Sequence, residues 1–285
     1  MTILREKAYA KLNLTLDVLG KRADGYHDLK SIMQTVSLHD DITLYLGTGE
    51  PWKLECSTEG IPCDERNLVW KAARLYLDTL GKDPGGLRMV IEKRIPSGAG
   101  MGGGSADAAA VLRALNRHYG EPLSVMELAE LGARVGSDVP FCVVGGTVLC
   151  EGRGEILTRL PDIPRCIFLI CKPEFSISTP VLYRQLDAVE DPLHPDNAAM
   201  GAAIHAGDRM GITKHIQNAF DPVVSAVYGE IGHIKGVFAA HGALAAQMTG
   251  SGSVVFAIMP DMDCAEAAAE ELKKTYAVVE IVFPV

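Results

Sequence analysis

The sequence has little that would hold the protein in a membrane or on a nucleic acid. No apolar run approaches the roughly 20 residues that cross a bilayer, and the first residues lack a signal-peptide core. Acidic side chains outnumber basic ones, and the net charge of −9 argues against nucleic acids and anionic membranes as partners. We therefore expect a soluble, cytoplasmic protein with no nucleic-acid or membrane partner. Composition does not give the oligomeric state, for which a monomer or a weak homodimer is the expectation.

Paired cysteines and acidic clusters are also absent. The seven cysteines are scattered, and none has the Cys-x-x-Cys spacing typical of zinc sites. An odd number without pairing indicates reduced thiols rather than disulfides. No metal-ligating residue is predicted. The 285 residues, 48% of them hydrophobic, can bury one large core or two smaller ones, and the length weakly favours two domains.

Glycine, in contrast, is concentrated in residues 96–105, which read Pro-Ser-Gly-Ala-Gly-Met-Gly-Gly-Gly-Ser. A strand-like run, residues 87–91, precedes this segment, and an Ala/Leu-rich helical pattern, residues 105–118, follows it. Glycine lets a backbone approach a ligand closely, and the N–H groups at a helix start attract anions. The segment therefore predicts a phosphate cradle. A flexible loop or tight turn without a ligand is the alternative interpretation.

Two common phosphate-binding motifs fit this segment poorly. A P-loop needs a lysine followed by Ser or Thr after its last glycine, whereas Ser105 and an alanine follow here. The dinucleotide fingerprint can be placed on three of the glycines. However, the acidic residue expected about twenty positions later falls on Glu121, in a turn.

Periodicity predicts a mixed α and β chain without internal repeats. Alternating or short apolar runs indicate strands at residues 12–18, 42–46, 53–56, 141–150, 166–171, 245–249, 254–259 and 278–283. Helical patterns occupy residues 68–80, 105–118, 124–135, 180–186, 201–205, 212–228 and 264–275. Asn67 is a candidate N-cap, and Ser124 with Glu127 forms a capping-box pair. A Gly/Pro-rich connection after residue 150 predicts domains of residues 1–155 and 156–285.

Two polar segments near the N-terminus invite a chemical interpretation. Lys11 and Asn13 share one face of an apolar strand, and leucines take the other. This face either meets water at a sheet edge or aims a cation at a phosphoryl group or a hydroxyl that loses its proton. Tyr26 and His27 follow a predicted turn. Alone they indicate a hairpin loop, but a tyrosine ring can stack on a nucleobase while a histidine hydrogen-bonds its edge.

Two further segments lie later in the chain. Asp138 follows the third helical pattern and precedes a predicted buried strand, where an aspartate most often forms a turn or a cap. It could also accept a hydroxyl proton, as an aspartate does in protein-kinase phosphoryl transfer. Residues 249–253, Thr-Gly-Ser-Gly-Ser, join two apolar strands. They form either a plain hairpin turn or a second amide-rich loop over phosphates.

In this order, the segments resemble the GHMP small-molecule kinases. The matching phrases are Ala-Lys-Leu-Asn-Leu, Arg-Ala-Asp-Gly-Tyr-His, Gly-Gly-Gly-Ser, Asp-Val-Pro-Phe and Ser-Ile-Ser-Thr-Pro, and they span nearly the whole chain. The resemblance implies an α+β fold of two kinase domains, the first binding ATP, with the active site in the cleft between them. It also implies phosphorylation of the 2-hydroxyl of 4-diphosphocytidyl-2-C-methyl-D-erythritol, in non-mevalonate isoprenoid biosynthesis, with Mg²⁺ held mainly by the nucleotide phosphates.

The resemblance also implies roles for single residues. Asp138 matches the catalytic base, and Lys11 matches the lysine that lowers the pKa of the attacking hydroxyl. The implied ATP-binding residues are Asn67, Lys93, Pro96, Gly98, Ala99, Gly100, Met101, Gly102, Gly103, Gly104 and Ser105. The implied substrate-binding residues are Asn13, Tyr26, His27, Thr179, Pro180, Tyr183, Thr249, Gly250 and Ser251. Of these, Tyr26 and Tyr183 would enclose the cytosine ring, and His27 would hydrogen-bond it.

Two departures and two alternatives stay open. Ala106 and Asp107 stand where many relatives have Ser-Asn or Ser-Asp, so a hydroxyl contact just after the glycine-rich segment stays open. Residues 218–221 lack the more acidic form expected and receive no role. Another GHMP kinase, acting on homoserine, mevalonate or a sugar, would have no use for the cytosine contacts. A non-catalytic relative that only binds its ligand would be expected to lose Lys11 or Asp138.

Overall fold

The computed structural model describes residues 1–285 and contains two compact units that interleave along the chain. The first unit holds residues 1–10, 38–97 and 102–145, and the second holds residues 11–37, 98–101 and 146–285. Both contain helices and strands, as an α+β fold requires. The sequence predicted two continuous domains, residues 1–155 and 156–285, whereas the compact units are discontinuous along the chain. The division into two family domains at residue 155 stays a prediction.

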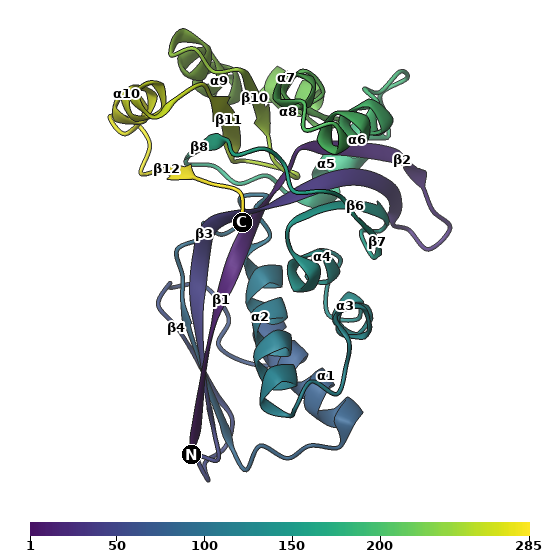
Figure 1. Cartoon of the computed structure of the whole chain (residues 1–285), viewed down its shortest axis with the longest axis vertical. Helices are drawn as coiled ribbons and strands as arrows, with labels where there is room; N and C mark the ends of the chain where they lie inside the picture. Colours follow the sequence, from purple (N-terminus) through teal and green to yellow (C-terminus); the bar gives the residue numbers. More distant parts are fainter. The chain divides into compact units, whose positions relative to one another are not determined.

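Two long strands, β1 (Thr2–Asn13) and β3 (His27–Leu46), contribute residues to both units. The other elements of the first unit are β4 (Lys53–Cys56), α1 (Leu68–Leu80), β5 (Leu87–Glu92), α2 (Gly103–His118), α3 (Val125–Ala133) and α4 (Val139–Val144). Strand β5 pairs in parallel with β4 and antiparallel with the second half of β3. Figure 1 shows α1 and α2 beside each other on one side of these strands. The alanine-rich face of α2 is buried, and small side chains let its neighbour approach closely.

The helix caps of the first unit form as predicted. The Asn67 side chain accepts a hydrogen bond from the backbone N–H of Val69, and α1 ends at Gly81 in the left-handed conformation. Ser124 and Glu127 form the reciprocal capping box at the start of α3. Local chemistry alone fixes these boundaries.

The second unit starts within β1, at Lys11, and includes the whole C-terminal part of the chain from residue 146. Its strands are β2 (Thr15–Lys21), β6 (Thr147–Gly152), β7 (Ile156–Arg159), β8 (Ile167–Lys172), β9 (Gln217–Asn218), β10 (Ala245–Met248), β11 (Val255–Met259) and β12 (Val278–Val282). Its helices are α5 (Thr179–Leu186), α6 (Asn197–His205), α7 (Arg209–Lys214), α8 (Asp221–Val227), α9 (Gly229–Ala240) and α10 (Met262–Leu272).

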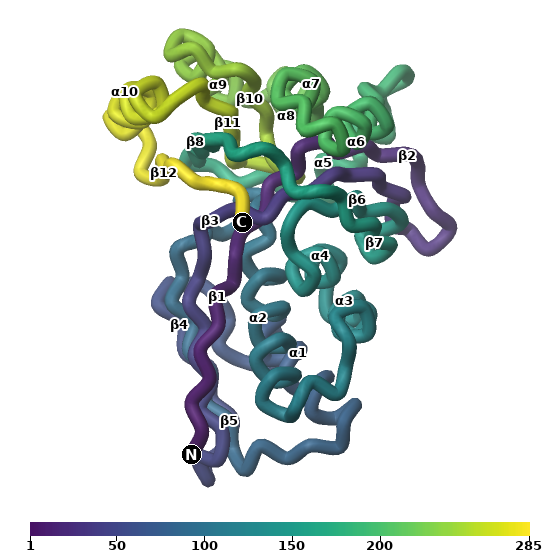
Figure 2. The backbone as a smooth tube through the Cα atoms, in the orientation of Figure 1, coloured from purple at the N-terminus to yellow at the C-terminus, as the bar shows by residue number.

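Antiparallel pairing orders four strands of the second unit as β10-β11-β8-β12. Helices α9 and α10 pack on this sheet, and Figure 1 shows them over the same face. Strand β2 pairs antiparallel with β3, which also pairs with β6. Figure 2 follows the last residues past β12 back to β3, where Pro284 forms a bridge with Val36.

Three sequence predictions are wrong in detail. The strand at residues 12–18 is interrupted, since β1 ends at Asn13 and β2 begins at Thr15. The helix at residues 212–228 is divided into α7, β9 and α8, and Pro222 stands at the start of α8, where its missing N–H costs nothing. The strand at residues 141–150 is helical at first, as α4, and becomes β6 only at Thr147. Every residue of α4 is buried, and a short run that is apolar all round has no helix or strand period.

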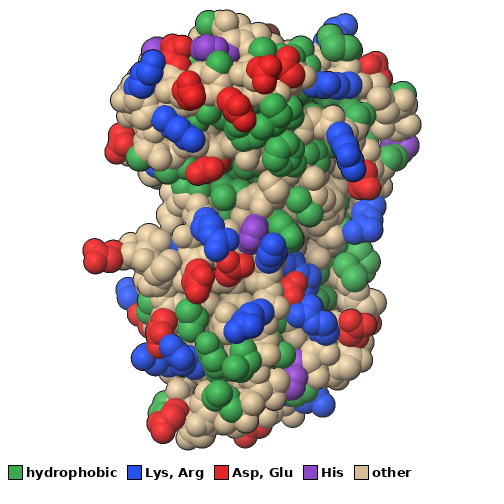
Figure 3. Space-filling view, turned by 60° about the vertical axis from the view of Figure 1, so that its left-hand side comes forward, with side chains coloured by type: hydrophobic (Ala, Val, Ile, Leu, Met, Phe, Trp, Pro, Cys, Tyr) green, Lys and Arg blue, Asp and Glu red, His purple; other side chains and the backbone are tan.

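The surface mixes charges of both signs. On the face drawn in Figure 3, lysines and arginines are interspersed with acidic side chains. None of the helices combines the length and apolarity needed to span a bilayer.

Candidate active site

The predicted site residues fall into both units, and each group is described within its own unit. The second unit holds Lys11, Asn13, Tyr26, His27, Gly98, Ala99, Gly100, Met101, Thr179, Pro180, Tyr183, Thr249, Gly250 and Ser251. The first unit holds Asn67, Lys93, Pro96, Gly102, Gly103, Gly104, Ser105 and Asp138. The glycine-rich segment is therefore shared, with its first part in the second unit.

Lys11 and Asn13 lie at the end of β1 with buried side chains, 3% and 1% exposed. The Lys11 ammonium donates to Asn13 Oδ1 at 2.5 Å, and Asn13 Nδ2 donates to Ser31 Oγ at 2.8 Å. Because an ammonium loses hydration when buried, it is kept at such a place only with polar partners. The interpretation that this polar face meets water at a sheet edge is therefore wrong. The strand instead holds a lysine in a polar, water-poor environment.

Three segments distant in sequence meet at this strand end. The backbone N–H of Lys11 donates to Met101 O at 3.1 Å, and that of Asn13 donates to Thr249 Oγ1 at 3.0 Å. The backbone N–H of Val254 donates to Ala99 O at 3.2 Å. The end of β1, the first part of the glycine-rich segment and the loop of residues 249–253 therefore form one hydrogen-bonded group in the second unit.

Glycine is required where these two loops touch. Gly100 has a φ of +76°, and a Cβ added there would lie 2.1 Å from Thr249 O. Gly250 has a φ of +58°, and a Cβ there would lie 2.8 Å from Gly100 O. Because a side chain at either position would drive the two backbones apart, both loops depend on glycine for their contact as well as for their conformation.

Asn218 fixes the base of the late loop and was given no role from the sequence. Its side chain is fully buried, and Nδ2 donates to Met248 O and Gly250 O, each at 2.8 Å. Asn218 also belongs to β9, which pairs with β2. The asparagine therefore ties the loop to the strand that follows Lys11 and Asn13. Its partners lie about thirty residues later in the chain, so no local pattern predicted them.

His27 and Tyr183, both predicted to contact a cytosine ring, are brought together. Their rings stack with centroids 4.3 Å apart at 17°, and Tyr183 meets Phe220 edge-on at 5.0 Å. His27 Nε2 lies 2.8 Å from Asp187 Oδ1. Asp187 and Phe220 were both missed. Asp187 stands four residues after Tyr183, at the end of α5, so helical spacing was the available indication.

Tyr26 is half exposed on the turn between β2 and β3, and the guanidinium of Arg153 lies 4.9 Å from its ring centroid. At the start of α5, Pro180 stands in the first turn, and Thr179 Oγ1 is 2.8 Å from Ser251 Oγ. The helix that carries Tyr183 is thus hydrogen-bonded to the late loop.

In the first unit, Lys93 is held by carboxylates. Its ammonium lies 2.5 Å from Asp40 Oδ2 and 2.8 Å from Asp107 Oδ2, and all three side chains are 5% exposed or less. Asp107 Oδ1 is buried without a hydrogen-bond partner. Burial raises the pKa of Asp107 to about 7, and the nearby negative charge of Asp40 adds to the rise, while Lys93 opposes it. The adenine contact of Lys93 stays a prediction, and Asp40 was missed.

The remaining ATP-binding predictions surround two helix starts. Gly102 has a φ of +70° and precedes α2, whose first residues are Gly103, Gly104 and Ser105. The N–H groups of such a first turn have no partner within the helix and can bind phosphate oxygens. Asn67 caps α1, and its Nδ2 donates to Pro62 O at 2.8 Å.

Asp138 stands at the N-cap position of α4 rather than before a strand. Its side chain makes no capping hydrogen bond, and its backbone is already helical, with a φ of −88°. The predicted cap role therefore does not apply. The chain also contains no group of three or more His, Cys, Asp or Glu side chains placed to hold a metal ion.

Comparisons with known proteins match this arrangement. Residues 67–146 match the model of the GHMP kinase N-terminal domain, and residues 193–278 match that of the GHMP kinase C-terminal domain. A 4-diphosphocytidyl-2-C-methyl-D-erythritol kinase from Caldicellulosiruptor saccharolyticus is 45% identical over 267 residues, which cover 94% of this chain and 92% of that protein.

Solved structures extend the match. The crystal structure of a 4-(cytidine 5'-diphospho)-2C-methyl-D-erythritol kinase superposes with a TM-score of 0.81 at 31% identity, covering 98% of both chains. A homoserine kinase from Cytophaga hutchinsonii superposes with a TM-score of 0.79 at 20% identity, covering 100% of this chain and 95% of that chain. The second similarity concerns the fold alone. With both family domains matched and a near-complete relative at 45% identity, the chain belongs to the GHMP kinases.

Proposed function

We propose that the protein transfers a phosphoryl group from ATP to the 2-hydroxyl of 4-diphosphocytidyl-2-C-methyl-D-erythritol, giving the 2-phosphate and ADP in non-mevalonate isoprenoid biosynthesis. The structural observation that best supports this proposal is the stacking of the His27 ring on the Tyr183 ring, with the Asp187 carboxylate hydrogen-bonded to His27. A flat polar base suits such a platform, whereas homoserine, mevalonate or a simple sugar has no aromatic ring to place there. The named relatives support the same substrate.

We assign the chemistry to two residues. Asp138 would accept the proton of the attacking hydroxyl as the general base. Lys11 would lower the pKa of that hydroxyl and offset the charge that develops as the phosphoryl group moves. Asn13, hydrogen-bonded to Lys11, would position the ammonium.

The backbone amides around the glycine-rich segment would bind the phosphates of ATP. Thr249, Gly250 and Ser251 would contact the diphosphate of the substrate. When bound, Mg²⁺ would neutralise phosphate charge, and since no cluster of acidic side chains is placed for it, the phosphates themselves would supply most of its ligands.

The cellular setting belongs to the same proposal. All seven cysteines are free thiols, which fits a reducing compartment such as the cytoplasm. We propose a cytoplasmic enzyme that acts as a monomer or weak homodimer and has a small-molecule substrate as its partner.

A coupled assay of ADP release tests this function. The protein would be given Mg-ATP with the cytidine substrate, with homoserine, with mevalonate or with 2-C-methyl-D-erythritol, and Asp138→Ala would be run beside it. We expect turnover that requires the cytidine group and falls by about 10²-fold or more in the variant. Turnover with a cytidine-free alcohol only would assign another GHMP kinase activity, and binding without turnover would assign a non-catalytic relative.

A further inference from the structure

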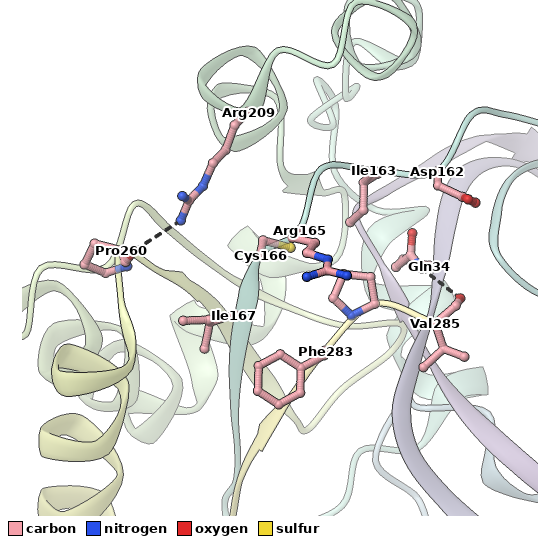
Figure 4. A pocket seen from close by; sticks show the side chains of 11 residues that line it. Gln34, Asp162, Ile163, Arg165, Cys166, Ile167, Arg209, Pro260, Phe283 and Val285 are labelled. Atoms are coloured by element: carbon pink, nitrogen blue, oxygen red, sulfur yellow. Dashed lines mark hydrogen bonds between the residues drawn. The ribbon is translucent and has the colours of Figure 1, made fainter.

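A cavity of about 630 Å³ lies in the second unit, and none of its lining residues belongs to the proposed phosphoryl-transfer machinery. Its walls come from the segment that leads into β8, from the last residues of the chain and from the starts of α7 and α10. Figure 4 labels the residues Gln34, Asp162, Ile163, Arg165, Cys166, Ile167, Arg209, Pro260, Phe283 and Val285. The volume is in the range of small-molecule sites.

Two arginines line this cavity, and neither pairs with a carboxylate. Arg165 is exposed and has no ion-pair partner. Arg209 donates through Nη2 to Met259 O at 3.0 Å and to Pro260 O at 3.4 Å, but its Nε is buried without an acceptor. Because neither guanidinium has a carboxylate beside it, the positive charge of both arginines is not neutralised by the protein, and an anion in the cavity would pair with it.

The absence of a carboxylate beside either arginine is informative because acidic residues are plentiful in this chain. It carries 36 acidic residues against 27 basic ones. Arginines that form ion pairs elsewhere in the chain include Arg22, Arg66, Arg88, Arg94 and Arg113. Asp162 supplies the only acidic side chain that lines the cavity, and it lies across the cavity from Arg209 in Figure 4. One end of the cavity is therefore positively charged, although the net charge of the protein is −9.

The rest of the wall is mostly apolar. Ile163 and Cys166 are buried, and Ile167 is half-buried beside them. Burial raises the pKa of the Cys166 thiol to about 12, so the side chain stays neutral and forms part of the apolar wall. Phe283 is 43% exposed, and Figure 4 shows its ring on the same side as Ile167. A purely inorganic anion would leave this apolar surface uncovered.

We propose that this cavity binds a small amphipathic anion, with a phosphate or carboxylate head at Arg165 and Arg209 and an apolar body against Ile167 and Phe283. The two guanidinium groups supply positive charge and charge-assisted hydrogen bonds to the anionic head. Covering Phe283 supplies the apolar part of the affinity. The negative charge of Asp162 would repel a second anionic group at its own end of the cavity, so the ligand is expected to have a single anionic head, at the arginines.

Calorimetric titration of the full chain tests this site with four probes: n-octyl phosphate, octanoate, inorganic phosphate and 1-octanol. We expect 1:1 binding of octyl phosphate or octanoate, and binding at least tenfold weaker for phosphate and octanol. Which of the two heads binds more tightly identifies the chemistry of the natural ligand. Equal binding of inorganic phosphate would overturn the apolar half of the proposal, and equal binding of octanol would overturn the anionic half.

Variants then locate the binding. Arg165→Met and Arg209→Met should each weaken the preferred probe by about tenfold or more, since each removes a charge-assisted hydrogen bond, while ADP release with the kinase substrates is retained. Arg209→Lys keeps a charge there and should retain more binding than Arg209→Met, which separates a ligand role from a packing role. Arg134→Met, at another exposed arginine, is the matched control. Undiminished binding in both cavity variants, or no binding of either amphipathic probe, would refute the site.

Discussion

At the scale of single residues, the buried charges around Lys93 carry a desolvation cost. One ammonium serves two buried carboxylates, and Asp107 keeps an oxygen without a partner. Desolvation of this kind is tolerated when a carboxyl can take up a proton. The raised pKa of Asp107, about 7, makes this group sensitive to pH in the neutral range.

Replacing Asp107 with Asn should change how stability depends on pH. The folded-state pKa lies above the ordinary value of 3.8, so the contribution of Asp107 is fully present at low pH and is lost as pH rises through about 7. Between pH 6 and 8 the free energy of unfolding of the native protein should fall by about 1 kcal/mol relative to Asp107→Asn. Urea unfolding at several pH values measures this difference. Asp78→Asn, at an exposed aspartate, should follow the native profile, and so should Asp107→Asn if the account of the pKa is wrong.

Asp187 should act on the cytidine substrate through His27. Removing the carboxylate in Asp187→Ala frees the imidazole that it holds at 2.8 Å. We expect KM for the cytidine substrate to rise by about tenfold, the order of one lost charge-assisted hydrogen bond, with KM for ATP unchanged. Steady-state kinetics with each substrate varied separates the two effects. Asp191→Ala, at an exposed aspartate nearby in sequence, is the control, and an equal change in both KM values would argue for a general structural effect.

Residue-scale prediction from the sequence succeeded where one segment carries the information. Lys11 and Asn13 could be placed on one face by strand alternation, and the structure brings them into direct contact. Partners from distant segments could not be predicted in this way. Asp40 meets Lys93 across 53 positions, and Asp187 meets His27 across 160. Such pairs are set by tertiary packing, which no local pattern encodes.

At the scale of elements, Gly100 and Gly250 let the glycine-rich segment and the loop of residues 249–253 touch within the second unit. Gly100→Ala should break this contact, since the new Cβ would fall 2.1 Å from Thr249 O. The positive φ alone costs alanine about 1–2 kcal/mol. Displacing the backbone of the late loop should add to this loss and lower kcat by about tenfold or more, because loop positioning governs the reacting geometry.

Gly207→Ala is the matched control for this variant. Gly207 has a φ of +63°, and an added Cβ would meet nothing within 4 Å. It should show the backbone cost in urea unfolding but keep kcat. If Gly100→Ala lost no more stability or kcat than Gly207→Ala, the loop contact would have no role beyond its conformation.

Helix and strand boundaries were predicted correctly where residues close in sequence determine them. The start of α1 follows from Asn67, and that of α3 from Ser124 with Glu127, because caps are made by neighbouring residues. The fully buried α4 gave no usable period. Helix α9 was missed, since its three glycines weaken a helical pattern that packing against the sheet sustains.

At the scale of the whole molecule, the chain matches both GHMP kinase domain models. The TM-score with the homoserine kinase, whose similarity concerns the fold alone, is nearly the same as the TM-score with the 4-(cytidine 5'-diphospho)-2C-methyl-D-erythritol kinase. Fold therefore does not decide the substrate; specific residues do. The fold class and the order of motifs were predictable from the sequence. The interleaving of the two units was not, because it arises from long strands that contribute to both.

The most direct test of the central claim is ³¹P NMR of the product formed from ATP and 4-diphosphocytidyl-2-C-methyl-D-erythritol. We predict one new phosphomonoester resonance, coupling of its phosphorus to the carbon at position 2, an intact cytidine diphosphate and one ADP per product. The Asp138→Ala variant should form the same product far more slowly. Inorganic phosphate and ADP with unmodified acceptor, or a phosphate at another hydroxyl, would contradict the account.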